Sequence, residues 1–389
     1  MGWRNAATRE PTVTIGPLAP VPADEAGAVD HDVSRETAAD GESSDDVSRE
    51  TAGASEPSAE VSRETVDAVE PHGDPADPAP GQDGPPDSAP LAAALLAEAQ
   101  RRDRVQQTEV RPPQQPRVLT VANQKGGVGK TTTTVNVAAA LAQSGLRVLV
   151  IDIDPQGNAS TALGIDHHAE VPSIYDVVVE GDELATVLQE CPDVPGLWCA
   201  PATIDLAGAE IELVSLVARE SRLKRAIDHY QQTPGAPGVF DYILVDCPPS
   251  LGLLTVNAFV AATEVFIPIQ CEYYALEGLS QLLNNIELIK AHLNPVLHVS
   301  TILMTMYDAR TRLSAQVADE VRTHFPDQVL KTSVPRSVRI SEAPSHGQTV
   351  LTYDPSSSGA LSYLEAAKEL ASRVPKIEDA QSGSPAGRP

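Results

Sequence analysis

A glycine-rich segment at residues 125–132, KGGVGKTT, constrains the fold of this chain more than any other feature of its sequence. An apolar run precedes it at 118–122 (VLTVA), and a helix-forming run follows it at 131–144. Glycines in a loop between a strand and a helix allow the backbone amides to surround phosphate groups, and the start of the helix adds partial positive charge. The segment therefore predicts a phosphate-binding loop in an α/β fold.

The residue types within this loop indicate that the phosphates belong to a nucleotide. Lys130 stands where a lysine can reach β- and γ-phosphates, and the Thr131 hydroxyl stands where it can ligate Mg²⁺. A GKT tripeptide is common by chance, but the strand, loop and helix context is not. The residues expected to contact the phosphates are Lys125, Gly126, Gly127, Val128, Gly129, Lys130, Thr131 and Thr132.

Carboxylates stand at the ends of two further apolar runs, 147–153 (RVLVIDI) and 241–246 (DYILVD). Ligands gather at the carboxyl ends of strands in open parallel sheets, so Asp152, Asp154 and Asp246 are expected near the nucleotide. Asp246 has the pattern of a carboxylate that holds Mg²⁺ through water. Of the other two, one can serve the metal and one can orient an attacking water, or Asp154 can act only as a cap.

The rest of the chain between 117 and 373 reads as one α/β domain. Apolar runs at 264–269 (EVFIPI) and 299–304 (VSTILM) predict more buried strands, and apolar residues line one face of a helix over 276–293. Short apolar strands that alternate with amphipathic helices predict a mostly parallel sheet covered by helices on both faces.

Residues 1–116 have a different composition. They contain 23 Asp and Glu, 9 Arg, no Lys and 15 of the 33 prolines, which predicts a disordered acidic arm. A helix is expected at 91–107 (LAAALLAEAQRRDRVQQ), either as a marginal helix at the edge of a linker or as a docking helix for a partner. Residues 374–389 predict a polar disordered tail. Residues 117–389 are also acidic, so DNA binding would need a local basic patch.

Several protein classes are disfavoured by the sequence. Cys191, Cys199, Cys247 and Cys271 show neither a CxxC pair nor a matching histidine spacing, so we expect buried apolar thiols and no zinc site. No apolar run approaches the roughly 20 residues that a membrane helix needs, and the N-terminus has no secretory pattern. These features predict a cytoplasmic protein.

The loop with its two lysines, Lys125 and Lys130, resembles the deviant Walker A motif of the ParA/MinD superfamily. Segments at 270–282 (QCEYYALEGLSQL), 304–317 (MTMYDARTRLSAQV) and 333–350 (SVPRSVRISEAPSHGQTV) resemble its ParA branch, the Soj-like chromosome-partitioning ATPases. The resemblance covers residues 117–373. It departs from the family in the long acidic arm, to which no family property transfers.

The resemblance implies roles for individual residues. Lys125 would cross a dimer interface to the ATP phosphates of the other subunit, which makes the ATP-bound state a homodimer. The alternative for Lys125 is an ordinary solvated loop lysine. Asp154 would activate the attacking water, and Asp152 would support the Mg²⁺ site with Asp246.

Basic residues cluster where this family binds DNA. Residues 310–339 carry a local balance of +3 within an acidic protein. The expected contacts are Arg310, Lys331, Arg336 and Arg339, which would bind double-stranded DNA through its phosphates without sequence preference. Ordinary surface ion pairs are the alternative for these side chains.

The resemblance also implies partners and a place in the cell. A ParB-like centromere-binding protein would stimulate hydrolysis, and the dimer would lie on the nucleoid without contacting a membrane. A MinD-like membrane ATPase is one alternative, but the C-terminal segment PKIEDAQSGSPAGRP offers no amphipathic helix. A metabolic P-loop enzyme is the other, and no cysteine spacing supports a cluster-bearing one.

The arm contains the pentapeptide VSRET three times, at 33–37, 47–51 and 61–65. One interpretation is a low-complexity repeat without a role. The other depends on the family resemblance. The centromere-like DNA site that partners such ATPases resembles GTTTCACGTGAAAC, which translates to these residues in one frame, so the repeat would encode such a site. Identical codons in the three copies would support the second interpretation.

Overall fold

The structure is a computed structural model, and the residues it describes are 89–233, 239–272 and 275–373. All of them belong to one compact unit, Gly81–Pro389. The VSRET repeats, most of the arm expected over 1–116 and the tail expected over 374–389 lie outside these residues.

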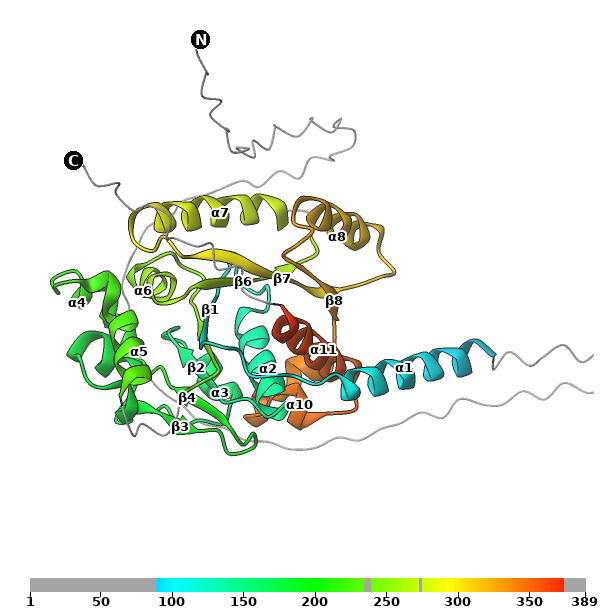
Figure 1. Ribbon diagram of the computed structural model, residues 1–389, viewed down its shortest axis with the longest axis horizontal. Coiled ribbons are helices and arrows are strands. Elements are labelled where there is room, and N and C mark those ends of the chain that lie inside the picture. The colour runs from blue at the N-terminus through cyan, green and yellow to red at the C-terminus, as the bar shows by residue number, and fades with distance from the viewer. Residues whose placement is uncertain (1–88, 234–238, 273–274, 374–389) are drawn as a thin grey trace, which may run out of the picture. The chain divides into compact units, whose positions relative to one another are not determined.

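Eight strands form a single sheet in the order β3-β4-β2-β5-β1-β6-β7-β8, with β1 inside it (Figure 1). The strands are β1 (Arg117–Val121), β2 (Val148–Asp152), β3 (Gln189–Glu190), β4 (Leu197–Ala200), β5 (Tyr242–Asp246), β6 (Glu264–Gln270), β7 (His298–Tyr307) and β8 (Val329–Pro335). All neighbours pair in parallel except β3 and β4. The predicted α/β fold with a mostly parallel sheet is confirmed.

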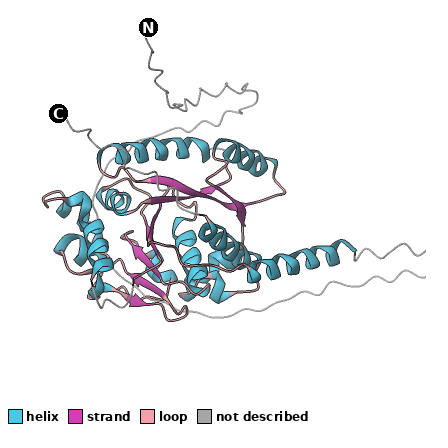
Figure 2. Cartoon of the chain, viewed as in Figure 1, coloured by secondary structure: helices cyan, strands magenta, loops and turns pink. Residues whose placement is uncertain are grey.

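Helices cover both faces of this sheet, as Figure 2 shows. One face packs against α4 (Leu206–Leu213), α5 (Arg222–Gln232), α6 (Leu253–Ala261), α7 (Ala275–His292) and α8 (Arg312–His324). The other packs against α2 (Lys130–Gln143), α3 (Asn158–Ala162), α9 (Val338–Glu342), α10 (Val350–Tyr353) and α11 (Ser358–Ser372). Single turns of other helix types are η1 (Asp176–Glu180), η2 (Leu184–Val187), η3 (Arg219–Ser221) and η4 (Ala343–His346).

Strand β1 shows why the predicted strands read as continuous apolar runs. Val118 faces one helical layer, whereas Leu119 and Val121 face the other, so both sides of the strand are buried. The four cysteines are buried and unbonded to one another, as predicted. Within the part of the chain that the structure describes, no helix combines the length and apolar character that a membrane crossing requires.

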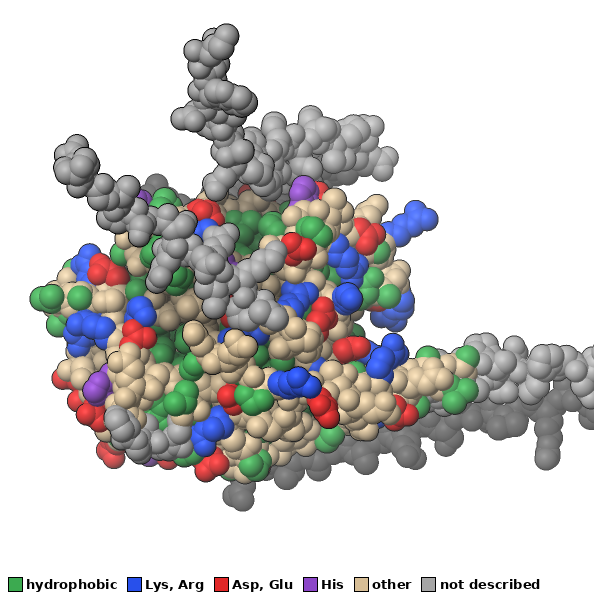
Figure 3. Space-filling model, viewed as in Figure 1, with side chains coloured by type: hydrophobic (Ala, Val, Ile, Leu, Met, Phe, Trp, Pro, Cys, Tyr) green, Lys and Arg blue, Asp and Glu red, His purple; other side chains and the backbone are tan. Residues whose placement is uncertain are grey.

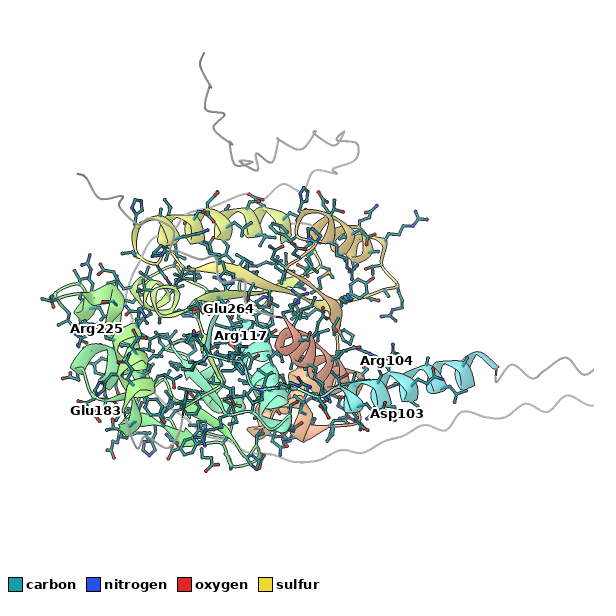
Figure 4. All side chains as sticks on the ribbon, in the orientation of Figure 1. Asp103, Arg104, Arg117, Glu183, Arg225 and Glu264 are labelled. Carbon is teal, nitrogen blue, oxygen red and sulfur yellow. The ribbon has the colours of Figure 1, made fainter. Side chains whose placement is uncertain are left out.

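A buried ion pair fixes the end of the sheet away from the glycine loop. Arg117, at the start of β1, donates to both carboxylate oxygens of Glu264 at 2.7 Å, and the two side chains are labelled close together in Figure 4. Further bonds from Arg117 reach the Tyr242 hydroxyl and the Leu370 carbonyl. Because its donors are satisfied in this way, the buried charge joins β1, β5, β6 and α11.

The helix expected at 91–107 is present as α1 (Ala89–Gln107). It packs against α11 of its own chain, where Val105 is 4% exposed. Composition alone placed the start of the domain at residue 117, but this packing begins upstream of that position. The physical reason is a small apolar contact at Val105, in the basic second half of the helix.

Candidate functional site

The glycine loop lies between β1 and α2, at the carboxyl edge of the sheet. Gly127 and Gly129 have φ angles of 74° and 88°, in the left-handed region that glycine adopts without strain. Strand β7, which β6 separates from β1, supports the loop, since the Thr305 hydroxyl donates to the Val128 carbonyl oxygen at 2.8 Å. Asn123 accepts from the Lys125 amide at 3.0 Å. The loop is therefore held in shape by the protein itself.

Lys130 is the first residue of α2 and is 7% exposed. Burial lowers the pKa of its ammonium group, while the nearby Asp246, Cys247 and Asp154 act in the opposite direction. An anion that enters the loop would stabilise this buried cation. The chemistry of the position thus suits a phosphate group.

Two buried carboxylates lie side by side behind the loop. Asp152 and Asp246 end the neighbouring strands β2 and β5 and are in register. Asp246 accepts from the Thr131 hydroxyl at 2.7 Å and from the Thr134 hydroxyl at 2.8 Å. Burial, followed by the charge of Asp152, raises the pKa of Asp246 to about 8. Burial also raises the pKa of Asp152, to about 6. A cation beside the pair would relieve this repulsion.

The oxygen ligands present fit Mg²⁺ bound together with a nucleotide. Thr131 and Asp246 supply hard oxygen atoms at the end of the loop. Residues 89–373, apart from the two short undescribed stretches, contain no group of three His, Cys, Asp or Glu side chains able to hold a metal. Mg²⁺ commonly takes one or two protein oxygens and completes its shell with phosphates and water. The set therefore suits such a shared site.

Both carboxylate oxygens of Asp152 accept hydrogen bonds from the protein itself. Its Oδ2 accepts from the Ser160 amide at 2.9 Å and from the Ser160 hydroxyl at 2.8 Å. Its Oδ1 accepts from the Asp154 amide at 3.2 Å. Asp152 thus anchors the start of α3 beside Asp246.

Asp154 lies two residues beyond the end of β2 and is 7% exposed. Its Oδ1 accepts from the Gln156 amide at 3.0 Å, which is the capping arrangement considered as an alternative. Among the described residues, Oδ2 has no hydrogen-bond partner and remains available to a water molecule. The geometry therefore accommodates both roles.

Lys125 is partly exposed, unlike the buried Lys130. Its ammonium group is 2.7 Å from the Glu272 carboxylate, and the two side chains are 37% and 46% exposed. Glu272 is a site residue that sequence reasoning missed. The signal was an acidic residue within QCEYYALEG, but nothing in the sequence indicated that this segment reaches the glycine loop.

Three of the four expected DNA contacts follow the ends of neighbouring strands. Tyr307 of β7 pairs with Pro335 of β8, so Arg310 and Arg336 emerge from adjacent loops, and Arg339 follows on α9. Lys331 lies earlier in β8, where it is exposed. The structure thus gathers three of these residues at one edge and places the fourth along the outermost strand.

Ion pairs partly neutralise this arginine surface, which we define as Arg310, Lys331, Arg336 and Arg339. Arg310 pairs with Asp308 at 3.0 Å, and Arg339 pairs with Glu342 at 3.0 Å and with Asp354 at 3.5 Å. Arg310 and Arg339 thus form the surface ion pairs that were the alternative to DNA contacts. Such exposed pairs are weak and can exchange for phosphate.

Comparisons with known proteins agree with this arrangement. The family model described as an AAA domain (AAA_31) matches residues 116–299. The chain is 53% identical over 255 residues to the sporulation initiation inhibitor protein Soj of Bacillus subtilis, covering 66% of this chain and 98% of that protein. It is 50% identical over 257 residues to the chromosome partitioning protein ParA of Caulobacter vibrioides, covering 66% and 94% of the two chains.

Solved structures give the same fold. A cobyrinic acid a,c-diamide synthase from Mycobacterium smegmatis, with bound ADP and magnesium, is similar with a TM-score of 0.55 and 38% identity. The similarity covers 65% of this chain and 93% of that one. The cell division ATPase MinD of Pyrococcus furiosus is similar with a TM-score of 0.53 and 25% identity, covering 65% and 98%. Since the chain is about half identical to Soj and ParA proteins over nearly their whole length, it belongs to the ParA/Soj family of chromosome-partitioning ATPases.

Proposed function

We propose that the protein is a Mg-ATP-dependent dimeric switch that holds DNA without sequence preference and releases it on hydrolysis. In this proposal two subunits close around ATP, and a ParB-like centromere-binding partner stimulates hydrolysis. The dimer would lie on the nucleoid in the cytoplasm. Membership of the partitioning family supports the outline, and the site geometry supports the individual roles.

Within one subunit, the loop amides and Lys130 would hold the phosphates of ATP. Thr131 and Asp246 would hold Mg²⁺, with Asp152 fixing the position of Asp246. Mg²⁺ would supply neutralisation of the charge that develops on the phosphates. Asp154 would orient the attacking water through its free oxygen, while its other oxygen keeps the turn after β2 in place.

The contrast between the two lysines carries the proposal of an ATP-linked dimer. Lys130 is 7% exposed, whereas the side chains of Lys125, five residues earlier, and of its partner Glu272 are 37% and 46% exposed. A lysine whose only role was to bind the nucleotide of its own subunit would not need this exposure. Its position suits a phosphate that a second subunit presents.

The arginine surface would bind the DNA backbone. Its side chains are exposed and reach outward from loops and one outer strand, so they can follow phosphates without reading bases. A dimer doubles the number of contacts, which makes binding depend on ATP. Such binding would weaken steeply with salt.

A metabolic P-loop enzyme is the second candidate function. One solved structure similar at 38% identity carries the name of an amide-forming synthase. Two relatives at 50% and 49% identity carry the name of a chromosome partitioning protein instead, which favours the first candidate.

Sedimentation of the protein with random-sequence double-stranded DNA, with and without ATP and Mg²⁺, tests the proposal. We expect co-sedimentation only with ATP and Mg²⁺, and loss of it in both Lys130→Ala and Arg339→Ala. The first variant should fail because it cannot bind nucleotide, and the second should still bind nucleotide. Liposomes serve as the control for a membrane ATPase.

Other outcomes distinguish the alternatives. Binding to liposomes but not to DNA would favour a MinD-like protein. Binding to neither, with ATP-dependent conversion of a small carboxylic acid, would favour a metabolic enzyme. Binding to DNA that is independent of ATP would contradict the dimeric switch.

A further inference from the structure

Helix α1 lies upstream of the residues that the family model matches, which begin at 116. Its charge also differs from that of the sequence before it. Residues 1–88 contain 5 Arg and 20 Asp and Glu, whereas residues 89–116 contain 4 Arg and 3 Asp and Glu. The acidic character of the arm therefore ends where the helix begins.

Polar contacts fix the C-terminal half of α1 on α11. Arg101 pairs with Glu365 at 2.5 Å and donates to the Ser362 hydroxyl at 3.1 Å. The Lys368 ammonium group donates to the carbonyl oxygens of Val105 and Thr108, at 2.5 and 2.9 Å. A cation at the C-terminus of a helix also interacts favourably with the helix dipole. The helix thus has a defined place on the domain.

One route from α1 to the arginine surface runs along α11. Glu365, which holds Arg101, is one helical turn from Glu369. Glu369 in turn accepts from the Lys331 amide at 2.8 Å. One turn of helix spans about 5.4 Å. Two contacts on successive turns of α11 therefore link Arg101 to the backbone of Lys331.

A second route passes through the turn before α11. Arg102 donates to the Ser356 carbonyl oxygen at 2.7 Å. Two residues earlier, Asp354 pairs with Arg339 at 3.5 Å. The basic end of α1 is thus one short turn away from a residue expected to contact DNA.

Arg104 is the residue of α1 that is free to bind an additional group. It is exposed, and no acidic side chain of the described residues forms an ion pair with it. In Figure 4 it is labelled on the side of α1 toward β8, and Asp103 on the other side. Lys and Arg side chains also gather on the domain above α1 in the same view (Figure 3).

We propose that α1 is a second DNA-contacting element, in which Arg104 binds the phosphates of the duplex held by the arginine surface. The inference rests on the proposed DNA binding and names a further part of that interface. Each phosphate contact contributes about 0.9 to the slope of log affinity against log salt concentration. One contact therefore changes affinity roughly eightfold between 1 M and 0.1 M salt.

The test measures binding of the full-length protein to random-sequence duplex DNA with ATP and Mg²⁺, by fluorescence anisotropy over a range of salt concentrations. Arg104→Ala should weaken binding about five- to tenfold per bound subunit at ~0.1 M salt and lower the slope by about one per bound subunit. The matched control is Arg225→Ala, an exposed arginine on α5, which is labelled on the far side of the domain from α1 in Figure 4. Nucleotide binding should be unchanged in both variants.

A third variant, Arg339→Ala, separates the two proposals. If the wild-type protein does not bind DNA, or if Arg339→Ala does not change DNA affinity, the proposed DNA binding is contradicted, and so is the role of α1. If Arg339→Ala weakens binding while Arg104→Ala behaves like Arg225→Ala, only the inference about α1 is overturned. Arg104→Glu checks the sign, because a reversed charge should weaken binding more than the neutral substitution.

Discussion

The glycine loop and the arginine surface are both expected to bind phosphate, but they differ in burial and in how firmly the protein holds their groups in place. In the loop, two glycines hold left-handed conformations and Lys130 is 7% exposed. On the arginine surface, the side chains of Arg310 and Arg339 are 90% and 55% exposed. The loop is fixed before its ligand arrives, whereas the surface keeps its charges in water.

This difference determines how much one residue matters in each region. A preorganised, water-excluded site concentrates its effect in a few groups whose positions are set in advance. An exposed basic surface adds many small contributions, each of which is screened by salt. We therefore expect substitutions in the loop to act strongly and at any salt concentration, and those on the surface to act moderately and in a salt-dependent manner.

Lys130→Ala should have the largest effect. Removal of a buried charge from a preorganised site costs about 10²–10³-fold in turnover, and we expect at least this loss in ATP hydrolysis. Steady-state hydrolysis and nucleotide binding, measured at low and high salt, check the prediction. Lys224→Ala on α5 is the control, since that lysine forms an exposed pair with Asp228. A loss that disappeared at high salt would contradict the contrast between the two regions.

Gly129→Ala should have the next largest effect. An alanine at a φ of 88° is strained by about 1–2 kcal/mol, which corresponds to a factor of roughly 5–30 in an equilibrium constant. Space is not the cause, because the nearest atom to an added Cβ is 3.9 Å away. Urea unfolding with a nucleotide titration measures the loss.

Gly126→Ala is the matched control for this strain. Gly126 belongs to the same loop, but it has no positive φ, and an added Cβ there meets nothing within 4 Å. We expect its free energy of unfolding to change little. Equal destabilisation of the two variants would contradict the assignment of the loss to the positive φ of Gly129.

Elements with a local sequence signal could be predicted from the sequence, and elements without one could not. The loop, the central strands and the long helices were predictable because their signals are local and periodic. Strands β4 and β3 were missed because they have four and two residues. Strand β8 was missed because Lys331 interrupts its apolar pattern, as polar residues often do in edge strands.

Contacts between distant segments could not be predicted in this way. Glu272 is 147 residues from Lys125, and Glu365 is 264 residues from Arg101. No short-range pattern encodes either pair, because each depends on how the sheet and its helices come together. The position of α1 on α11 is a second example, since composition alone gave residue 117 as the start of the domain.

Arg339→Ala should have a moderate, salt-dependent effect. Loss of one phosphate contact weakens DNA binding about five- to tenfold per bound subunit at ~0.1 M salt and much less near 1 M. Its partners Glu342 and Asp354 are left without their cation, which adds local repulsion of DNA. A salt titration of DNA affinity, with nucleotide affinity measured in parallel, checks the result. An equal loss at both salt concentrations would indicate damage to the fold instead.

Glu272→Gln should have the smallest effect, because it changes an exposed ion pair beside the glycine loop. Glu272 holds Lys125 with an exposed ion pair, and such pairs are worth about 0.2–1 kcal/mol. If Lys125 must leave this carboxylate to reach the phosphates of a second subunit, the variant should form the ATP-dependent dimer up to about fivefold more readily. Sedimentation equilibrium with ATP and Mg²⁺ measures the dimer, and Lys125→Ala should abolish it.

The control for this last substitution is Glu287→Gln, an equal change of charge at an exposed position on α7. If Glu272→Gln weakens the dimer while Glu287→Gln does not, Glu272 supports the ATP-bound state and does not restrain Lys125. If both strengthen it equally, the effect arises from the net charge of an acidic chain, because removal of any negative charge reduces repulsion between subunits. If only Glu272→Gln strengthens the dimer, the ion pair between Glu272 and Lys125 is what restrains Lys125. The same ion pair would then oppose dimer formation in the absence of ATP.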